Sequence, residues 1–157
     1  MDLVIAGVVV GLMGTLAMDA GNLLIAKAGC ITKIDVGTIG RMAAGWTKGR
    51  LRYGHPSEME EVPNEMLLGY DTHIGIGVGF AVPYLLAWTL FIGGTPSPVW
   101  TIAYGVATTA ASWFFVYPNM GLGAFGRRSP EGLKASISPL VNHLFFGLGM
   151  AAGIALL

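Results

Sequence analysis

The first apolar stretch of the chain reads LVIAGVVVGLMGTLAMDAGNLLIA and occupies residues 3–26. A helix that crosses a bilayer needs about 20 mostly apolar residues, so this stretch is long enough to span one. Asp2 stands where a signal peptide would carry positive charge, and the run is long and lacks a good small-residue cleavage site. We therefore expect a retained transmembrane helix, with Asp19 and Asn22 inside its apolar length.

Three further stretches have the same character, at residues 66–92, 99–117 and 136–157. The composition agrees with them, because only 11% of the residues are charged and 54% are hydrophobic. A soluble domain usually carries about 25% charged residues to solvate its surface. The sequence therefore predicts an all-α, polytopic membrane protein, in which residues 1–157 form a single domain with four transmembrane helices in a bundle.

The basic residues indicate the orientation. All nine lysines and arginines lie between the first and second spans or between the third and fourth, and the loop at residues 93–98 carries no charge. By the positive-inside rule the basic loops are cytoplasmic and both termini are periplasmic. The formal net charge is zero, so nothing indicates a nucleic-acid partner. The single cysteine, Cys30, excludes an internal disulfide framework.

Residues 36–51 of the first basic loop place apolar side chains at helical spacing, and their basic residues lie on other faces. This pattern predicts a short amphipathic helix at the membrane interface, with Trp46 at the headgroup level. Arg41 and Arg50 are then suited to contact anionic headgroups. A charged segment that is merely solvated would show the same composition.

A glycine-rich turn at residues 121–126 precedes Arg127 and Arg128 in the second basic loop. Glycines can expose backbone N–H groups to an anion, and arginine binds phosphate or carboxylate through its planar fork. The turn is therefore a candidate anion or headgroup contact. The alternative is a flexible turn whose arginines only anchor the orientation, since no P-loop pattern is present.

Five polar side chains lie within the predicted spans: Asp19, Asn22, His73, Asn142 and His143. An ionisable group inside a membrane is costly, so it usually faces a partner or a water-filled cavity. At 1.5 Å rise per residue, Asp19, His73 and His143 lie about 11, 13 and 10 Å from the cytoplasmic ends of their helices. They therefore share one level, and we expect these five residues to form a polar pocket.

Small and hydroxyl residues also recur at helical spacing, and such faces let membrane helices approach closely. We expect three of these stripes to face inward, and three GxxxG pairs to supply further packing surface. The stripes are Gly11, Thr15, Asp19 and Asn22; Thr101, Gly105, Thr108 and Ser112; and His143, Gly147 and Ala151. The pairs are Gly7 with Gly11, Gly75 with Gly79, and Gly149 with Gly153.

Several functions could use the pocket, and the residues leave them open. The main hypothesis is binding or translocation of a small polar solute, a proton or a metal. Asp19, His73 and His143 are plausible ligands for iron or zinc, and the two histidines could ligate a haem. The same residues could satisfy one another with no chemistry. In that case the protein would be an accessory subunit of a larger membrane complex, and no catalytic motif argues for an enzyme.

Two parts of the sequence resemble a bacterial integral-membrane family known only as a domain of unknown function. YPNMGLGAFGRRSP and HLFFGLGM resemble its C-terminal half, and IGRMAAGWTKGRLRYGH with the entry to the second span resembles its central part. The resemblance implies a small four-span bacterial membrane protein and supplies no activity. We expect this protein in the inner membrane. The residues that it carries over are Arg41, Gly49, Arg50, His55, Glu65, His73, Gly121, Gly123 and His143.

Overall fold

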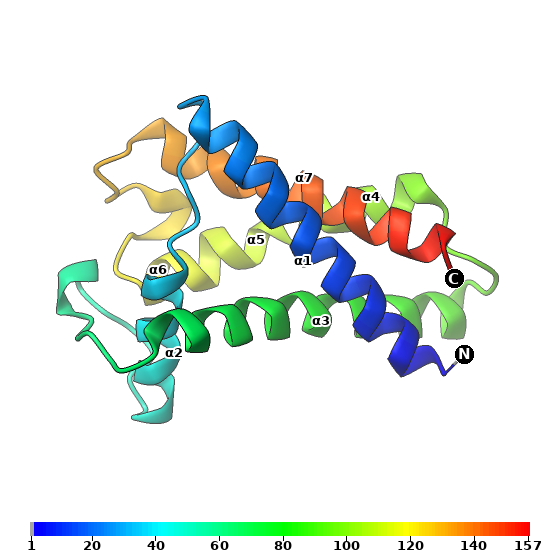
Figure 1. Cartoon of the computed structure of the whole chain (residues 1–157), viewed down its shortest axis with the longest axis horizontal. Coiled ribbons are helices and arrows are strands. Elements are labelled where there is room, and N and C mark those ends of the chain that lie inside the picture. Colours follow the sequence, from blue (N-terminus) through cyan, green and yellow to red (C-terminus); the bar gives the residue numbers. More distant parts are fainter. Residues whose placement is uncertain (1) are drawn as a thin grey trace.

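The computed structural model describes residues 2–157, and this part of the chain is helical with no strand. Four helices are long and apolar enough to cross a membrane: α1 (Leu3–Lys27), α3 (Glu65–Phe91), a third span (Pro98–Asn119) and α7 (Leu133–Ala155). Figure 1 shows α3, the third span and α7 running roughly along the long axis of the molecule, with α1 crossing obliquely. The predicted all-α fold with four spans is confirmed, so this is a multi-pass membrane protein. The predicted ends differ from the observed ones by three residues at most.

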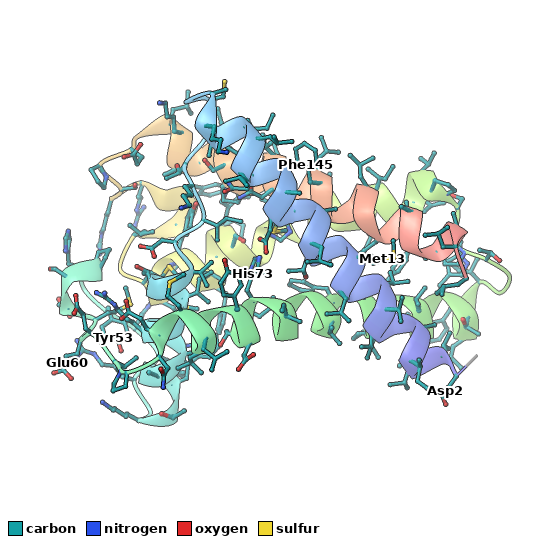
Figure 2. The ribbon with its side chains drawn as sticks, viewed as in Figure 1. Asp2, Met13, Tyr53, Glu60, His73 and Phe145 are labelled. Atoms are coloured by element: carbon teal, nitrogen blue, oxygen red, sulfur yellow. The ribbon has the colours of Figure 1, made fainter. Side chains whose placement is uncertain are left out.

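The outer surface of the spans is apolar, as lipid contact requires. Leu90 is 75% exposed and Leu133 is 73% exposed, whereas the buried positions of α1 include four glycines. Figure 2 shows side chains standing outward along the helices. Large residues thus face outward and small ones face the neighbouring helix, which is typical of packing between helices in a membrane.

The third span is not a continuous α-helix. It consists of α4 (Pro98–Ala107), α5 (Thr109–Ala111), a π-helical turn η2 (Ser112–Val116) and α6 (Tyr117–Asn119). Pro118 has no backbone N–H, so the regular ladder of hydrogen bonds cannot pass through it. Wider turns of this kind are common beside functional sites, and this one lies at the wall of the cavity described below.

Each proline inside α3 and α7 leaves one backbone carbonyl without its helical hydrogen-bond donor. Tyrosine hydroxyls of the third span donate to carbonyls nearby. Pro139 cannot bond the carbonyl of Ala135, and the Tyr117 hydroxyl donates to that oxygen at 2.9 Å. The Tyr104 hydroxyl donates to the carbonyl of Phe80, close to the proline in α3, also at 2.9 Å. The two proline-containing helices therefore lose less hydrogen bonding in an apolar medium than their sequence suggests.

α1 packs between α3 and α7, and α7 also packs against α4. α1 crosses α3 toward the end that carries both termini, and the two helices diverge toward the opposite end (Figure 1). We call the end with the termini the terminal end. The other is the basic end, because all nine lysines and arginines lie in its loops, in α2 or in the adjoining ends of α1 and α7. α3 meets α4 through aromatic rings, including Tyr84 stacked on Tyr104 with centroids 4.5 Å apart.

The closest helix contacts are made by glycine. A Cβ built on Gly105 would overlap the backbone of Gly147, and one built on Gly147 would lie 2.9 Å from the Cα of Ile102. Two of the predicted small-residue stripes therefore meet between α4 and α7. The GxxxG pairs divide: Gly7 with Gly11 and Gly149 with Gly153 pack between helices of the bundle, whereas Gly75 and Gly79 have no atom near their Cβ positions.

The predicted amphipathic helix is present as α2 (Val36–Thr47) and packs against the start of α3. Gly40 lies against the backbone of α3 there, and the side chain of Met42 is fully buried. The Trp46 indole N–H donates to the Asn119 side-chain oxygen at 3.2 Å, which ties α2 to the end of the third span. The apolar face of α2 is thus covered by protein, and the helix is shorter than the predicted residues 36–51.

Candidate functional site

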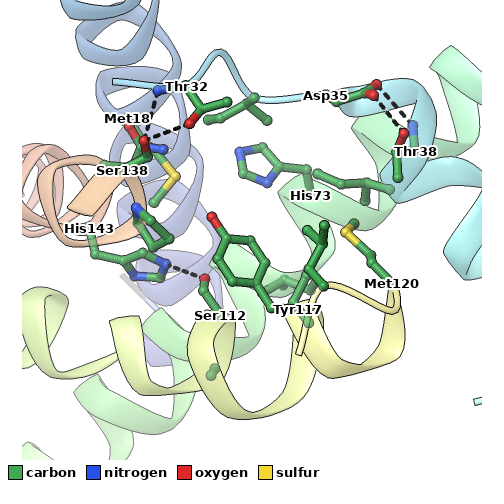
Figure 3. Close-up of a pocket in the computed structure, with 18 of the residues that line it drawn as sticks. Met18, Thr32, Asp35, Thr38, His73, Ser112, Tyr117, Met120, Ser138 and His143 are labelled. Atoms are coloured by element: carbon green, nitrogen blue, oxygen red, sulfur yellow. Dashed lines mark hydrogen bonds between the residues drawn. The ribbon is translucent and has the colours of Figure 1, made fainter. Parts of the chain in front are cut away.

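A cavity of about 300 Å³ lies at the basic end, between the four spans. The segment at residues 28–35, here called the strap, joins α1 to α2 and covers one side of it (Figure 3). Most of the lining is apolar, with Met18, Ile76, Phe80 and Phe146 among the residues. The polar residues within the spans that also line it are Thr15, His73, Ser112, Tyr117, Ser138, Asn142 and His143. Lys33 and Asp35 of the strap line it too and are exposed, so the cavity reaches the surface.

Asn22 fastens the strap. Its amide N–H groups donate to the carbonyl of Thr32 and to the side-chain oxygen of Asn142, each at 3.0 Å. Its own oxygen accepts from the backbone N–H of Ile34 at 3.0 Å, and the side chain is almost completely buried. Ser138 of α7 adds a hydroxyl oxygen that accepts from the Thr32 N–H at 2.7 Å. Asn22 and Asn142, predicted as pocket residues, therefore hold the cover in place.

His143 is saturated by hydroxyls of the third span. Thr108 Oγ1 donates to the carbonyl of Gly105 at 2.6 Å, so it accepts from His143 Nδ1–H at 2.7 Å. Nε2 is then the acceptor for the Ser112 hydroxyl at 3.1 Å. This assignment follows from the hydrogen-bond network and makes the imidazole neutral. His143 therefore joins α7 to the third span and offers no free nitrogen to a ligand.

His73 differs, because only one of its nitrogens is used. Nε2 lies 3.1 Å from Asp19 Oδ1, as the shared depth of the two residues predicts. The Asp19 side chain is 31% exposed and that of His73 is 14% exposed. His73 lines the cavity, whereas Asp19 lies behind it, outside the lining. Figure 3 shows the His73 imidazole between the strap and the ring of Tyr117.

The predicted metal and haem ligands do not form a ligand set. Within residues 2–157, no three His, Cys, Asp or Glu side chains come together closely enough to hold a metal ion. His143 would have to give up the Ser112 hydroxyl to ligate iron, which leaves His73 as a single available histidine at the cavity. The residues therefore do not fit a resident metal or haem.

Two of the predicted anion-binding arginines are paired within the chain. Arg41 makes two hydrogen bonds to Glu65, at 2.7 and 2.9 Å, and this carboxylate raises the pKa of the guanidinium. Arg50 lies 2.7 Å from Glu58. The Arg41 pair joins α2 to the start of α3, and the Arg50 pair lies within the loop that follows α2. A headgroup contact by either arginine stays a prediction.

The glycine-rich turn of the second basic loop closes on itself. Gly121 has φ of 83°, which favours glycine, and its Cα faces the backbone of His55. The N–H groups of Gly126, Arg127 and Arg128 donate to carbonyls within the turn. Both arginine side chains are exposed and make no ion pair with any residue from 2 to 157. An anion contact by Arg127 or Arg128 stays a prediction.

Sequence reasoning missed several residues of the site. Tyr117 and Ser138 both line the cavity. A signal for Tyr117 existed, because Pro139 must leave a carbonyl unbonded in an apolar helix. Outside the cavity lining, Asp71 was also missed: it lies within the second span and is exposed on α3, one turn before Gly75.

Four spanning helices around a cavity that opens at one end define a multi-pass membrane protein with an internal binding-sized space. Its sequence matches, over residues 8–157, the family model described as "Protein of unknown function (DUF2938)". The chain belongs to this family, which confirms the predicted resemblance. No curated protein and no solved structure matches the chain.

Proposed function

We propose that this protein binds a small amphiphilic molecule in the cavity at the basic end. The volume of about 300 Å³ is at the lower limit of ligand pockets, which favours a small ligand. The lining is mainly apolar with a few polar groups from different helices, which is typical of such sites. These features favour an amphiphile over the small polar solute that the sequence suggested.

The observation that carries this proposal is an open space in an otherwise closely packed bundle. Elsewhere the helices touch through glycine backbones, so the same fold could have closed this space with larger side chains. A void among apolar side chains lowers stability in proportion to its volume, by about 24 cal/mol per Å³ in one measured series. Hydrogen bonds of Asn22 to the strap and of His143 to the third span fix the walls around this space in a defined arrangement.

Filling the cavity tests the proposal. Ile76 lines it, and Ile76→Trp should occupy much of its volume with an indole. We expect native mass spectrometry of the protein, released from nanodiscs, to show a bound small molecule in the wild type and none in Ile76→Trp. Leu67→Trp is the matched control, because Leu67 is 63% exposed on the same helix. A wild type without bound molecule, or equal retention by both variants, would contradict the proposal.

The proposal places the protein in the bacterial inner membrane, with the basic end in the cytoplasm and both termini in the periplasm. The distribution of lysine and arginine supports this orientation. In a Cys30→Ser background, a membrane-impermeant thiol reagent should label Ser97→Cys from outside intact cells. Ser57→Cys and Ser129→Cys should react only after lysis. Labelling of Ser57→Cys in intact cells would reverse the orientation.

A second candidate function is an accessory subunit that docks on a membrane complex. One observation favours it: Gly75 and Gly79 form the GxxxG pair that the bundle does not use, and Asp71 is exposed beside them. A partner helix could approach closely at this face. The bilayer itself is the partner that the remaining apolar surface requires.

A further inference from the structure

The His73 imidazole lies between a carboxylate and the cavity. Asp19 Oδ1 accepts from Nε2–H, so the lone pair of the neutral ring is on Nδ1. Nδ1 makes no hydrogen bond to residues 2–157, and it is not among their buried unsatisfied atoms, so it is accessible. Because the ring lines the cavity, the cavity contains a proton acceptor that is supported by a negative charge.

The carboxylate decides what kind of donor suits this acceptor. A neutral hydroxyl needs only a hydrogen-bond acceptor, and a threonine oxygen or a backbone carbonyl would serve. Asp19 adds a charge within a membrane span, where charge is costly, and within residues 2–157 it contacts one titratable partner. Protonation of His73 turns this contact into an ion pair, so the pair favours a ligand that delivers a proton.

The other titratable groups around the cavity do not compete for that proton. Both nitrogens of His143 are hydrogen-bonded, and the Tyr117 hydroxyl donates a hydrogen bond to the carbonyl of Ala135. Asp35 accepts from the backbone and hydroxyl of Thr38 at the start of α2. The groups that face His73 from the elements around it are Asp19 on α1, Lys33 and Asp35 on the strap, Tyr117 on the third span and His143 on α7.

Lys33 supplies the opposite charge for an anion. It lines the cavity from the strap and makes no salt bridge with any residue from 2 to 157. Lys33 on the strap and a protonated His73 on α3 would both border the same space. A carboxylate formed inside the cavity would therefore have cationic neighbours.

Resting on the proposed function, we infer that the ligand is a lipophilic carboxylic acid and that His73 accepts its proton. The O–H bond of the acid breaks, an N–H bond forms at Nδ1, and Asp19 keeps its charge. The carboxylate stays beside the imidazolium, and the alkyl chain lies among Met18, Ile76 and Phe80. Because carboxylic acids in water ionise near pH 4 (about 4.3 for Glu), binding from neutral solution takes up a proton.

Calorimetry with octanoate tests this inference in nanodiscs at pH 7.5, in buffers of different ionisation enthalpy. The wild type should take up about one proton per octanoate bound, by linkage. Affinity for total octanoate should fall by about tenfold per pH unit on the alkaline side. His73→Gln and Asp19→Asn should both abolish the proton uptake and weaken binding by about tenfold or more. His55→Gln is the matched control, because His55 is exposed and outside the cavity.

Octan-1-ol and methyl octanoate separate the possible outcomes. If octan-1-ol or methyl octanoate binds as tightly as octanoate, or if octanoate binds without proton uptake, the inference that the ligand is a carboxylic acid is wrong. The proposed function of the cavity would still stand. Proton uptake that persists in Asp19→Asn and His73→Gln would also overturn it. If His73→Gln fails to fold, the number of protons taken up per octanoate by the wild type and by Asp19→Asn still tests the inference. The proposed function itself fails only on the mass-spectrometric result, when the wild type carries no bound molecule or when Ile76→Trp and Leu67→Trp retain it equally.

Discussion

Gly105→Leu is expected to prevent a stable bundle from forming. The new side chain would occupy the position of the Gly147 backbone and lie close to the carbonyl of His143. α4 and α7 must then move apart, which also breaks the hydrogen bonds of Thr108 and Ser112 to the imidazole. Overpacking costs about 1 to 3 kcal/mol and each lost buried bond about 1 kcal/mol, so the total should exceed about 3 kcal/mol.

The measurement is the melting temperature and the monodisperse yield of the purified variant in detergent. Gly75→Leu is the matched control, because nothing lies within 4 Å of its Cβ position. It should melt like the wild type. If Gly75→Leu nevertheless loses a co-purifying membrane subunit, the accessory-subunit function gains support. A Gly105→Leu protein as stable as Gly75→Leu would show that α4 and α7 do not meet through glycine.

The number of spans could be predicted because the bilayer imposes a length on apolar helices. The contact between Asp19 and His73 could be predicted for a related reason. Each residue has a fixed rise along its helix, so two residues at the same depth on neighbouring helices can meet. The rise per residue does not give the rotation of each helix about its axis or the distance between two helices. It grouped His143 with Asp19, although His143 is bound by Thr108 and Ser112.

The paired arginines show a second kind of limit. Arg41 is a basic residue on a helix near a membrane, and that pattern fits a lipid phosphate as well as a carboxylate. The structure shows Glu65, at the start of the next span, as its partner. An acidic residue in the first turn of a helix is favoured by the helix dipole alone, so Glu65 gives no sign in the sequence of an arginine partner. Sequence periodicity cannot choose between partners that have the same charge.

The strap was the least predictable part of the site. Residues 28–35 have no periodic pattern, and their contacts use backbone groups that any sequence offers. Asn22 was recognised as costly in a membrane, but nothing in its spacing pointed to Thr32 or Ile34. A polar residue just before the end of a span can bind the chain that leaves it, because that chain must satisfy its own N–H and C=O groups.

Asn22→Ala should therefore be among the most destabilising single changes that remove atoms. It leaves the Thr32 carbonyl, the Ile34 N–H and the Asn142 oxygen without their partner, the first two half-buried and the third buried. Each unsatisfied group costs about 1 to 3 kcal/mol, so a loss of about 3 kcal/mol or more is expected. Asn142→Ala leaves one such group, an N–H of Asn22, and should cost about 1 to 3 kcal/mol.

Two measurements distinguish a released strap from general unfolding. Thermal melts in detergent should rank Asn22→Ala below Asn142→Ala and both below the wild type. Hydrogen exchange should rise first at Ile34, whose N–H loses its acceptor. The octanoate affinity of Asn22→Ala should fall as well, because Lys33 lies on the same segment and lines the cavity. Equal stability of the two alanine variants would mean that Asn22 contributes only its contact with Asn142, and the strap would not depend on it.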